Sequence, residues 1–283
     1  MNPSLQPPDA GTVASDVERA LAEDIGTGDF TADLLPDGPA SAYVLCRQSA
    51  VIAGQPWFDA TFRALDDAVR VAWRIGEGAQ VQAGTVLCTL QGRSRALVSG
   101  ERTALNFLQT LSATATLTAR FVEAVRGTGV RILDTRKTLP GLRLAQKYAV
   151  RAGGGHNHRL GLHDAMMLKE NHIMAAGSIE AAIARARALH PGIPLIVEVE
   201  TLDELDRALA GRPERILVDE FPMADLREAV RRARGLVPLE ISGGVELDSI
   251  RPLAETGVDC ISIGALTKHV RAVDLSMRFG TPP

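Results

Sequence analysis

Residues 195–220 carry the clearest structural pattern of the chain, and their sequence is LIVEVETLDELDRALAGRPERILVDE. The apolar, valine-rich run at 195–199 is typical of a buried strand, and 216–218 is a second run of this kind. Between these runs, leucine and alanine recur at helical spacing in residues 202–209. The stretch therefore predicts a strand–helix–strand unit whose two strands are parallel.

The same alternation continues on both sides of this unit. The expected strands are residues 130–133, 165–168, 195–199, 216–218, 239–241 and 260–263. The expected helices are residues 179–189, 202–209, 224–233 and 247–255. Because these units follow one another at intervals of roughly 20–30 residues, the pattern favours an α/β barrel over an open sheet.

The first half of the chain has a different pattern. Short strand-like runs are separated by glycine-containing turns and by one helical segment, which predicts an α+β unit. The expected strands are residues 43–46, 51–53, 69–73 and 86–90, and the helix is 56–65. The apolar spacing of residues 102–125 then predicts one long amphipathic helix or two consecutive ones.

Composition and charge exclude several classes of protein. The chain has 31 Lys and Arg against 34 Asp and Glu, so it lacks the basic excess of a nucleic-acid-binding protein. Its three cysteines, Cys46, Cys88 and Cys260, are far apart and suit a reducing compartment. The chain has no signal-peptide pattern at its start and no run of 18 apolar residues. We therefore expect a cytoplasmic protein without a membrane segment.

Charged and polar residues follow the ends of the expected strands in the second half. Parallel strands of a barrel end at one face, where the active site lies, so these residues are candidates for a common site. They are Arg136 and Lys137, Lys169, Glu198, Asp219, Ser242 with Gly243 and Gly244, and Gly264.

The candidate residues favour an anionic ligand. Arg136, Lys137 and Lys169 bring fixed positive charge, and His158 and Arg159 add to it. The turns at residues 242–244 and 264–265 lack bulky side chains and can offer backbone N–H groups to a phosphate. Glu198 and Asp219 end neighbouring strands, and such a carboxylate pair beside a phosphate site suits Mg²⁺. An alternative interpretation is a metal-dependent hydrolase. His156, His158 and His163 lie close together in the sequence, and histidine is a common metal ligand.

These residues lie in motifs that resemble the quinolinate phosphoribosyltransferase (nicotinate-nucleotide pyrophosphorylase) family in its bacterial form. The similarity covers nearly the whole chain, with the family motifs in the same order. The motifs are ALAEDIGTGD (20–29), ERTALNFLQ (101–109), DTRKT (134–138), GGGHNHR (153–159), LKENH (168–172), VEVE (197–200) and ISGG (241–244).

The resemblance implies a role for each site residue. The quinolinate-binding cations correspond to Arg102, Arg136, His158 and Arg159, and Lys137 and Lys169 complete the basic pocket. The carboxylates that act on the metal and the ribose correspond to Glu198 and Asp219, and the phosphate turns correspond to Ser242, Gly243 and Gly264. Lys137, Lys169, Glu198 and Asp219 are the implied catalytic residues.

The resemblance also implies a fold and an assembly. The expected fold is an α/β sandwich domain joined to an incomplete, seven-stranded α/β barrel of the type II phosphoribosyltransferases. We expect the sandwich domain at residues 1–111, joined by 272–283, and the barrel at 112–271. The expected assembly is a homodimer in which Arg102 reaches the neighbouring site. The chain departs from the family pattern at Ala113, Thr114 and Glu220; the family often has Asn at the position of Glu220.

The implied activity is a decarboxylating phosphoribosyl transfer. Quinolinate and phosphoribosyl pyrophosphate give nicotinate mononucleotide, pyrophosphate and CO₂ in de novo NAD biosynthesis, with Mg²⁺ as cofactor. The alternatives are a sister enzyme that acts on nicotinate or another acid, and a pyridine-carboxylate sensor that has no catalytic activity. The arginine pair Arg136 and Arg159 favours a diacid over nicotinate.

Overall fold

The computed structural model describes residues 5–282, which form two compact units. The first unit consists of Met1–Ala119, Thr138–Gly154 and Leu266–Pro283. The second consists of Arg120–Lys137 and Gly155–Ala265. In the part of the chain that the structure describes, no helix is both long and apolar enough to cross a bilayer.

An antiparallel sheet organises the first unit. Its strand order is β12 (Leu275–Phe279), β1 (Pro39–Cys46), β5 (Val86–Arg93) and β3 (Arg70–Trp73). A separate ribbon pairs β2 (Ala50–Val51) with β4 (Gln80–Val81). The C-terminal segment belongs to this unit because β12 pairs with β1 along five residue pairs, from Ala42 with Phe279 to Cys46 with Leu275.

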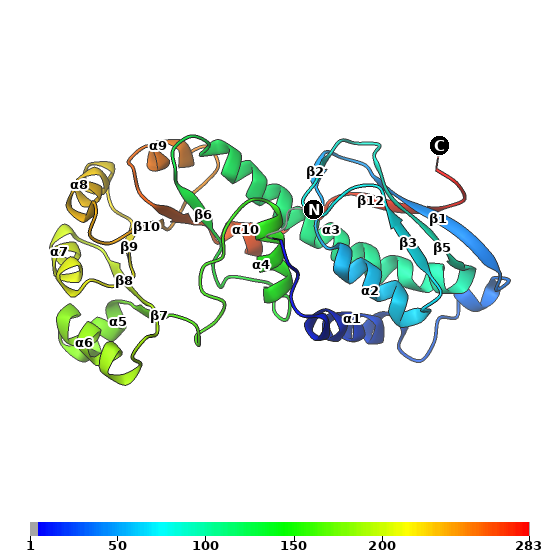
Figure 1. The fold of residues 1–283 in the computed structure, drawn as a ribbon, viewed down its shortest axis with the longest axis horizontal. Helices are drawn as coiled ribbons and strands as arrows, with labels where there is room; N and C mark the ends of the chain where they lie inside the picture. Colours follow the sequence, from blue (N-terminus) through cyan, green and yellow to red (C-terminus); the bar gives the residue numbers. More distant parts are fainter. Residues whose placement is uncertain (1–4, 283) are drawn as a thin grey trace. The chain divides into compact units, whose positions relative to one another are not determined.

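Helices complete the first unit (Figure 1). They are α1 (Ala10–Ile25), the 3₁₀ turn η1 (Ala32–Leu34), α2 (Gln55–Leu65), α3 (Ser94–Ala124), α4 (Arg143–Ala152) and α10 (Ala265–Lys268). The expected helix at 102–125 is part of the single continuous helix α3. The apolar residues of α3 enter two cores, one under the sheet with Leu105 and Leu108, and one against α1, α2 and α4 with Leu111.

The expected domain boundary lies between residues 111 and 112. The two compact units instead divide the chain after Ala119, Lys137, Gly154 and Ala265. Helix α3 is continuous across residues 111 and 112, and its hydroxyl groups bind the first unit. Ser112 Oγ accepts from Ala53 N (3.0 Å), and Thr116 Oγ1 accepts from Val51 N (2.9 Å). Helix α4 also joins this unit, where Gln146 Nε2 donates to Thr267 O (2.8 Å).

A parallel sheet organises the second unit. Its strand order is β6-β11-β10-β9-β8-β7, so the first strand lies beside the last. The strands are β6 (Arg131–Leu133), β7 (Met166–Leu168), β8 (Leu195–Val199), β9 (Arg215–Asp219), β10 (Leu239–Ser242) and β11 (Cys260–Ser262). They agree with the expected strands to within one residue at each end. The sequence predicts them well because parallel strands bury both faces and therefore read as apolar runs.

The crossover helices are α5 (Glu170–Ala176), α6 (Ile179–Leu189), α7 (Leu202–Gly211), α8 (Met223–Ala233) and α9 (Ile250–Ala254). They lie along the outer side of the sheet (Figure 1). The sheet is an incomplete barrel, because β6 and β7 are both edge strands and do not pair. Among the described residues, this sheet has six assigned strands, whereas the expected barrel has seven. At the β6 edge a single parallel bridge between Leu133 and His156 takes the place of the seventh strand.

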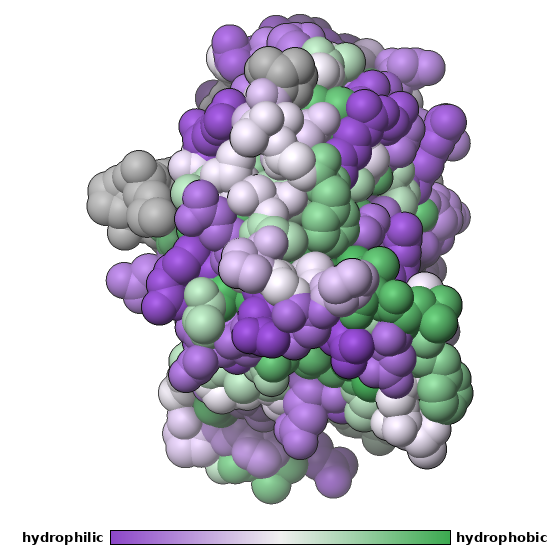
Figure 2. Space-filling model, turned by 90° about the vertical axis from the view of Figure 1, so that its right-hand side faces the viewer, coloured by the Kyte–Doolittle hydropathy of each residue, from purple (hydrophilic) through white to green (hydrophobic). Residues whose placement is uncertain are grey.

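The surface contains both hydrophilic and hydrophobic side chains. Figure 2 shows one face of the molecule, on which hydrophilic residues are widespread and hydrophobic residues gather toward the lower right of the view. In the first unit, Phe30 and Leu34 are the most exposed large hydrophobic residues, at 78% and 82%. Single exposed apolar residues are common, but neighbouring ones often mark a contact surface.

Glu220, directly after β9, has an unusual backbone conformation. Its φ is +53°, and Arg212 is the one other non-glycine residue with positive φ among residues 5–282. An L-residue with a long side chain is strained in this region, whereas Asn adopts it more easily. This explains physically why Asn suits the position at which the family pattern differs from this chain.

We predict that Glu220→Asn raises the free energy of unfolding by about 0.5–1 kcal/mol, because Asn relieves this strain. Chemical denaturation with an unchanged m-value measures the change. The control is Glu246→Asn, which alters an exposed glutamate whose φ is not positive. Equal effects of the two substitutions would show that backbone strain at Glu220 is not the cause.

Candidate active site

A cavity of about 310 Å³ lies in the second unit, at the carboxyl ends of the parallel strands. It brings together most of the predicted site residues, although they come from different strands and loops. Of the predicted residues, Arg136, Lys137, His158, Arg159, Lys169, Glu198 and Ser242 line it. Thr135, Met167, Leu217, Glu240 and Ser262 complete the lining.

Strand register determines which side chains enter the cavity. Side chains alternate between the two faces of a strand, so Glu240 and Ser242 of β10 share the cavity face. Leu217 of β9 also lines the cavity, and Asp219 lies two residues further along the same face. Since β9 pairs Asp219 with Ser242 of β10, these two residues end their strands side by side.

Two arginines with the same charge face this cavity. Arg136 follows β6, and Arg159 lies in the loop before β7. Arg159 Nη1 donates to the Ala165 carbonyl oxygen (3.0 Å), which holds the guanidinium against its own loop. Burial and the charge of Arg136 lower the pKa of Arg159, while Asp164 opposes them. This arrangement favours a bound anion, which would offset the repulsion between the arginines.

Lys169 and Glu198 form an ion pair across the cavity wall. Lys169 is the N-cap residue of α5, and its backbone N–H donates to His172 Nδ1 (3.2 Å). Glu198 is near the end of β8, and its side chain is 12% exposed. The pair places one cation and one carboxylate next to each other. When a substrate binds, each of the two side chains can leave this partner and pair with a charged group of the substrate.

Two glycines lie against predicted catalytic side chains. Gly243 has φ +91°, and a side-chain carbon built on it would lie 3.0 Å from Asp219 Oδ1. A side-chain carbon on Gly264 would lie 2.9 Å from Lys137 Cδ. Any larger residue would therefore move Asp219 or Lys137. The predicted phosphate turns thus also leave space for these two side chains.

The sequence did not single out Glu240, which is fully buried in the middle of β10. Glu240 Oε2 accepts from Arg215 Nη1 (2.6 Å) and lies 3.3 Å from His158 Nε2. Asp134, also fully buried, accepts from the backbone N–H of His158 (2.8 Å). A glutamate inside the apolar run at 239–241 was a visible signal, because a buried charge requires a partner.

Arg102 is exposed on α3 and belongs to the first unit. All residues that line the 310 Å³ cavity belong to the second unit. The cavity in one unit therefore already contains four predicted cationic side chains, from Arg136, Lys137, Arg159 and Lys169, without Arg102.

The histidines at positions 156, 158 and 163 were the basis of the alternative prediction, a metal-dependent hydrolase. His156 forms the bridge to Leu133, and burial, followed by the charge of Arg131, lowers its pKa. His158 is buried next to Glu240. Within residues 5–282, no three His, Cys, Asp or Glu side chains gather as a set of metal ligands.

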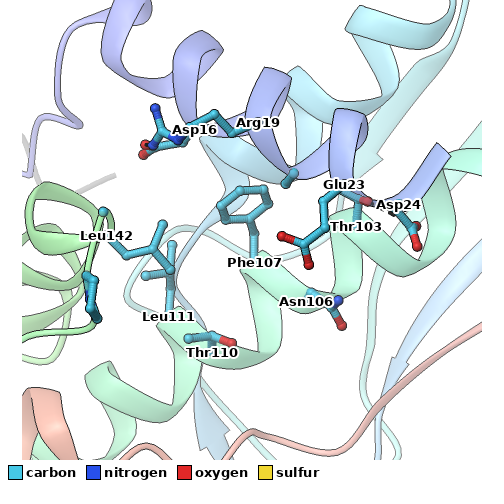
Figure 3. A pocket seen from close by; sticks show the side chains of 13 residues that line it. Asp16, Arg19, Glu23, Asp24, Thr103, Asn106, Phe107, Thr110, Leu111 and Leu142 are labelled. Atoms are coloured by element: carbon cyan, nitrogen blue, oxygen red, sulfur yellow. Dashed lines mark hydrogen bonds and ion pairs between the residues drawn. The ribbon is translucent and has the colours of Figure 1, made fainter. Parts of the chain in front are cut away.

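A second cavity, of about 340 Å³, lies in the first unit between α1 and α3 (Figure 3). Its charged lining consists of Asp16, Glu23 and Asp24 against Arg19. Asp16 and Arg19 form an ion pair, and Asp16 also accepts from Trp57 Nε1 (3.0 Å). Figure 3 shows Phe107 between this pair and the two remaining carboxylates. The excess of carboxylates makes this cavity unsuitable for a diacid.

The chain matches two models of one protein family. Residues 29–112 match "Quinolinate phosphoribosyl transferase, N-terminal domain", and residues 114–278 match "Quinolinate phosphoribosyl transferase, C-terminal domain". The match is therefore to the family that the motifs resemble, and it extends over both halves of the chain.

Individual relatives agree with the family models. A nicotinate-nucleotide pyrophosphorylase [carboxylating] of Mycobacterium leprae is 44% identical, over 92% of this chain and 95% of its own. A quinolinate phosphoribosyltransferase [decarboxylating] of Nicotiana tabacum is 36% identical, over 94% and 81%. The solved nicotinate-nucleotide pyrophosphorylase from Francisella tularensis is 42% identical, with a TM-score of 0.96, over 99% and 100%. On the combined evidence of sequence, fold and site geometry, the chain belongs to the quinolinate phosphoribosyltransferase family.

Proposed function

We propose that this chain transfers the phosphoribosyl group of phosphoribosyl pyrophosphate to quinolinate. The products are nicotinate mononucleotide, pyrophosphate and CO₂, and the reaction belongs to de novo NAD biosynthesis. One observation carries the proposal: Arg136, Arg159, Lys137 and Lys169 surround a single small cavity that also contains Glu198. The names of the relatives support it, since "carboxylating" describes the same reaction in reverse.

The arginine pair recognises the two carboxylates of quinolinate. Arg136 and Arg159 come from different loops, so they can approach one small ring from two sides. A guanidinium binds a carboxylate through two parallel hydrogen bonds, which fixes orientation as well as charge. Nicotinate has one carboxylate and would leave one of these partly buried arginines without a counter-charge. The pocket therefore favours quinolinate over nicotinate.

The first chemical step requires no general base, because the pyridine nitrogen already has a free lone pair. This nitrogen forms a bond to the anomeric carbon of the ribose, while the bond from that carbon to the pyrophosphate oxygen breaks. Positive charge develops on the sugar, and the carboxylates of Glu198 and Asp219 stabilise it. Lys169 then leaves its ion pair with Glu198 and binds an anionic group of the substrates.

The second step is decarboxylation of the quinolinate ring. The bond between ring carbon 2 and its carboxylate breaks, and CO₂ leaves. The electron pair stays on carbon 2, next to the positively charged ring nitrogen, which stabilises it. A proton then replaces the carboxylate to give nicotinate mononucleotide. Lys137 and Lys169 hold the remaining anionic groups during this step.

Mg²⁺ is part of the proposal, and Glu198 and Asp219 would hold it. Mg²⁺ in enzymes of this kind is bound by one or two carboxylates together with substrate phosphates. The donor set fits this mode, since Glu198 lines the cavity and Asp219 lies against the turn at Gly243, which can bind a phosphate. When bound, Mg²⁺ would neutralise charge on the departing pyrophosphate.

We also propose a homodimer in which Arg102 of one copy enters the site of the other. The exposed Phe30 and Leu34 lie in a segment that is fastened to α3, because Ser99 Oγ donates to Asp29 Oδ2 (2.7 Å). Ser99 and Arg102 are three residues apart in α3 and therefore share a helix face. An apolar segment beside an exposed arginine suits contact with a second copy. A cytoplasmic location agrees with three free cysteines, all buried.

The proposal predicts that the parent protein, given quinolinate, phosphoribosyl pyrophosphate and Mg²⁺, forms CO₂ and nicotinate mononucleotide. Arg159→Ala should lower kcat/KM for quinolinate about 30-fold to a few thousand-fold, since losing one partner of a buried charge pair costs roughly 2–5 kcal/mol. Arg159→Lys should recover only part of the activity, because a point charge does not reproduce the planar fork. Steady-state kinetics with quinolinate and nicotinate measures both effects.

The affinity for phosphoribosyl pyrophosphate is the internal control for Arg159 and should change little. Arg234→Ala is a matched control, since this exposed arginine of the second unit does not line the cavity. Turnover of quinolinate by Arg159→Ala within about threefold of the parent would contradict this placement of the diacid. An inactive parent protein that still binds quinolinate would favour the sensor alternative.

The assignment of the carboxylates predicts a change in metal dependence. Glu198→Gln and Asp219→Asn should raise the Mg²⁺ concentration for half-maximal rate on the order of tenfold, which corresponds to about 1.4 kcal/mol. Quinolinate binding, measured by calorimetry without metal, should remain, because Lys169 becomes available when Glu198 loses its charge. Glu255→Gln is the control, since this exposed glutamate of the second unit does not line the cavity and is paired with Arg251. Loss of quinolinate binding with normal Mg²⁺ dependence would show that Glu198 and Asp219 contact quinolinate and not the metal.

The shared site predicts complementation between inactive variants. Arg102→Ala and Lys169→Ala homodimers should each be nearly inactive. After subunit exchange, each heterodimer has one intact site, so an equal mixture should recover about a quarter of the parent activity. Activity is measured before and after exchange, and mass spectrometry of differently tagged copies confirms that exchange occurred. Exchange without recovery would show that Arg102 does not act across the dimer.

A further inference from the structure

The side chain of Gln146, in α4, is fully buried and binds three segments of the first unit. Its Oε1 accepts the backbone N–H of Leu139 (2.8 Å), and its Nε2 donates to the carbonyl oxygen of Thr267 (2.8 Å). Nε2 also donates to Thr114 Oγ1 of α3, over a longer distance (3.4 Å). An amide group has its acceptor and its two donor hydrogens at fixed positions, so one orientation of the Gln146 side chain satisfies all three partners.

Two of these partners lie where the chain passes from the second unit into the first. The chain leaves the second unit after Lys137, and Leu139 is two residues further on. It leaves the second unit again after Ala265, and Thr267 of α10 is also two residues further on. One buried amide therefore holds the first-unit ends of both connections, and Figure 1 shows α4 and α10 next to each other.

The second-unit ends of the same two connections meet at the proposed phosphate side of the site. A side-chain carbon built on Gly264 would lie 2.9 Å from Lys137 Cδ, so the lysine side chain lies against this glycine. The backbone N–H of Lys137 donates to Thr135 Oγ1 (3.1 Å), which holds the turn that carries the lysine. A shift of either connection would change the distance between the lysine and the Gly264 turn.

The diacid side of the site is held by contacts that do not involve Gln146. Arg136 is the third residue after β6, a strand of the second unit. The guanidinium of Arg159 donates to the Ala165 carbonyl oxygen, which belongs to the same unit. Loss of the Gln146 contacts should therefore affect the phosphate side of the site more than the diacid side.

We propose that Gln146 is a positioning residue for phosphoribosyl pyrophosphate, because it ties the connection after Lys137 to the connection after Gly264. The proposal rests on the proposed function for the identity of the substrate. It goes beyond that function by assigning a role to a buried amide that does not line the cavity. It also gives a role to Thr114, at which the chain departs from the family pattern, since its hydroxyl group is an acceptor for Gln146 and an apolar side chain would offer none.

Calorimetry with phosphoribosyl pyrophosphate and Mg²⁺ tests this role without relying on turnover. Gln146→Met keeps the length of the side chain and removes its three hydrogen bonds. It should weaken phosphoribosyl pyrophosphate binding about fivefold or more, because a small misplacement of a charged contact is costly. The Kd for quinolinate alone should change by less than about twofold. Equal losses of affinity for both substrates, or a parent-like affinity for phosphoribosyl pyrophosphate, would overturn the proposal.

A double-mutant cycle tests the route through Lys137. In the Lys137→Ala background, Gln146→Met should weaken phosphoribosyl pyrophosphate binding by less than about twofold, since the side chain that it positions is absent. The same calorimetric titration measures the parent, both single variants and the double variant. Full additivity of the two losses would show that Gln146 does not act through Lys137, and the proposal would fail.

A second buried glutamine of the first unit provides the control for stability. Gln55 is 7% exposed, and its Nε2 donates to the Ile75 carbonyl oxygen (3.1 Å), away from both connections in the sequence. Gln55→Met should lower the Tm as Gln146→Met does, but leave both substrate affinities unchanged. If Gln55→Met weakens phosphoribosyl pyrophosphate binding as much as Gln146→Met does, the effect is one of general stability and the proposal is wrong.

Hydrogen exchange tests the contact between Gln146 and the first connection directly. The backbone amide of Leu139 should exchange slowly in the parent protein and at least about tenfold faster in Gln146→Met, because its acceptor is lost. It should exchange at the parent rate in Gln55→Met. A parent rate in Gln146→Met would contradict the proposal. If the parent protein forms no nicotinate mononucleotide, the proposed function fails and the substrate assignment with it, while the exchange rates still decide whether Gln146 holds this connection.

Discussion

The parallel direction of β6–β11 is the constraint on which the site depends. Parallel strands end at a common edge, so residues that follow successive strands meet there despite long separations in the sequence. Lys169 follows β7, Glu198 is the last residue but one of β8, and Asp219 ends β9. The pairing of Asp219 with Ser242 extends the same edge to β10. No local motif holds these groups together, and a change of one residue in strand register would turn each of them away from the cavity.

Charge balance is the second organising feature. The cavity lining contains more cations than carboxylates, and two of the cations are arginines that repel each other. The fold tolerates this because both glutamates of the lining are paired: Glu240 with Arg215, and Glu198 with Lys169. A dianionic ligand supplies the missing negative charge, so ligand binding and relief of repulsion occur together. The same logic separates this cavity from the acidic one between α1 and α3.

Backbone geometry limits what can surround these charges. Gly243 and Gly264 leave room for Asp219 and Lys137, and no larger residue fits at either position without moving them. Glu220 lies between Asp219 and the start of the next helix segment in a left-handed conformation that suits Asn better. The chain keeps this strain directly beside a proposed catalytic residue, where backbone position decides where the carboxylate points.

The sequence alone determined the type and position of most elements of the second unit. The predicted bounds of β8 and α6 agree with the structure at both ends, because a strand buried on both faces and an amphipathic helix leave clear local patterns. The same patterns indicated which charged residues follow the strands. Seven of the predicted site residues line one cavity, namely Arg136, Lys137, His158, Arg159, Lys169, Glu198 and Ser242.

Only the tertiary structure decided how distant segments combine. It places β6 beside β11, reduces the expected seventh strand to the bridge at His156, and assigns α4 and most of α3 to the first unit. It also places His158 next to Glu240, a buried partner that the sequence pattern did not single out. Periodicity reports whether a residue is buried, but it does not report its partner, because a partner is chosen by packing between segments far apart in the chain.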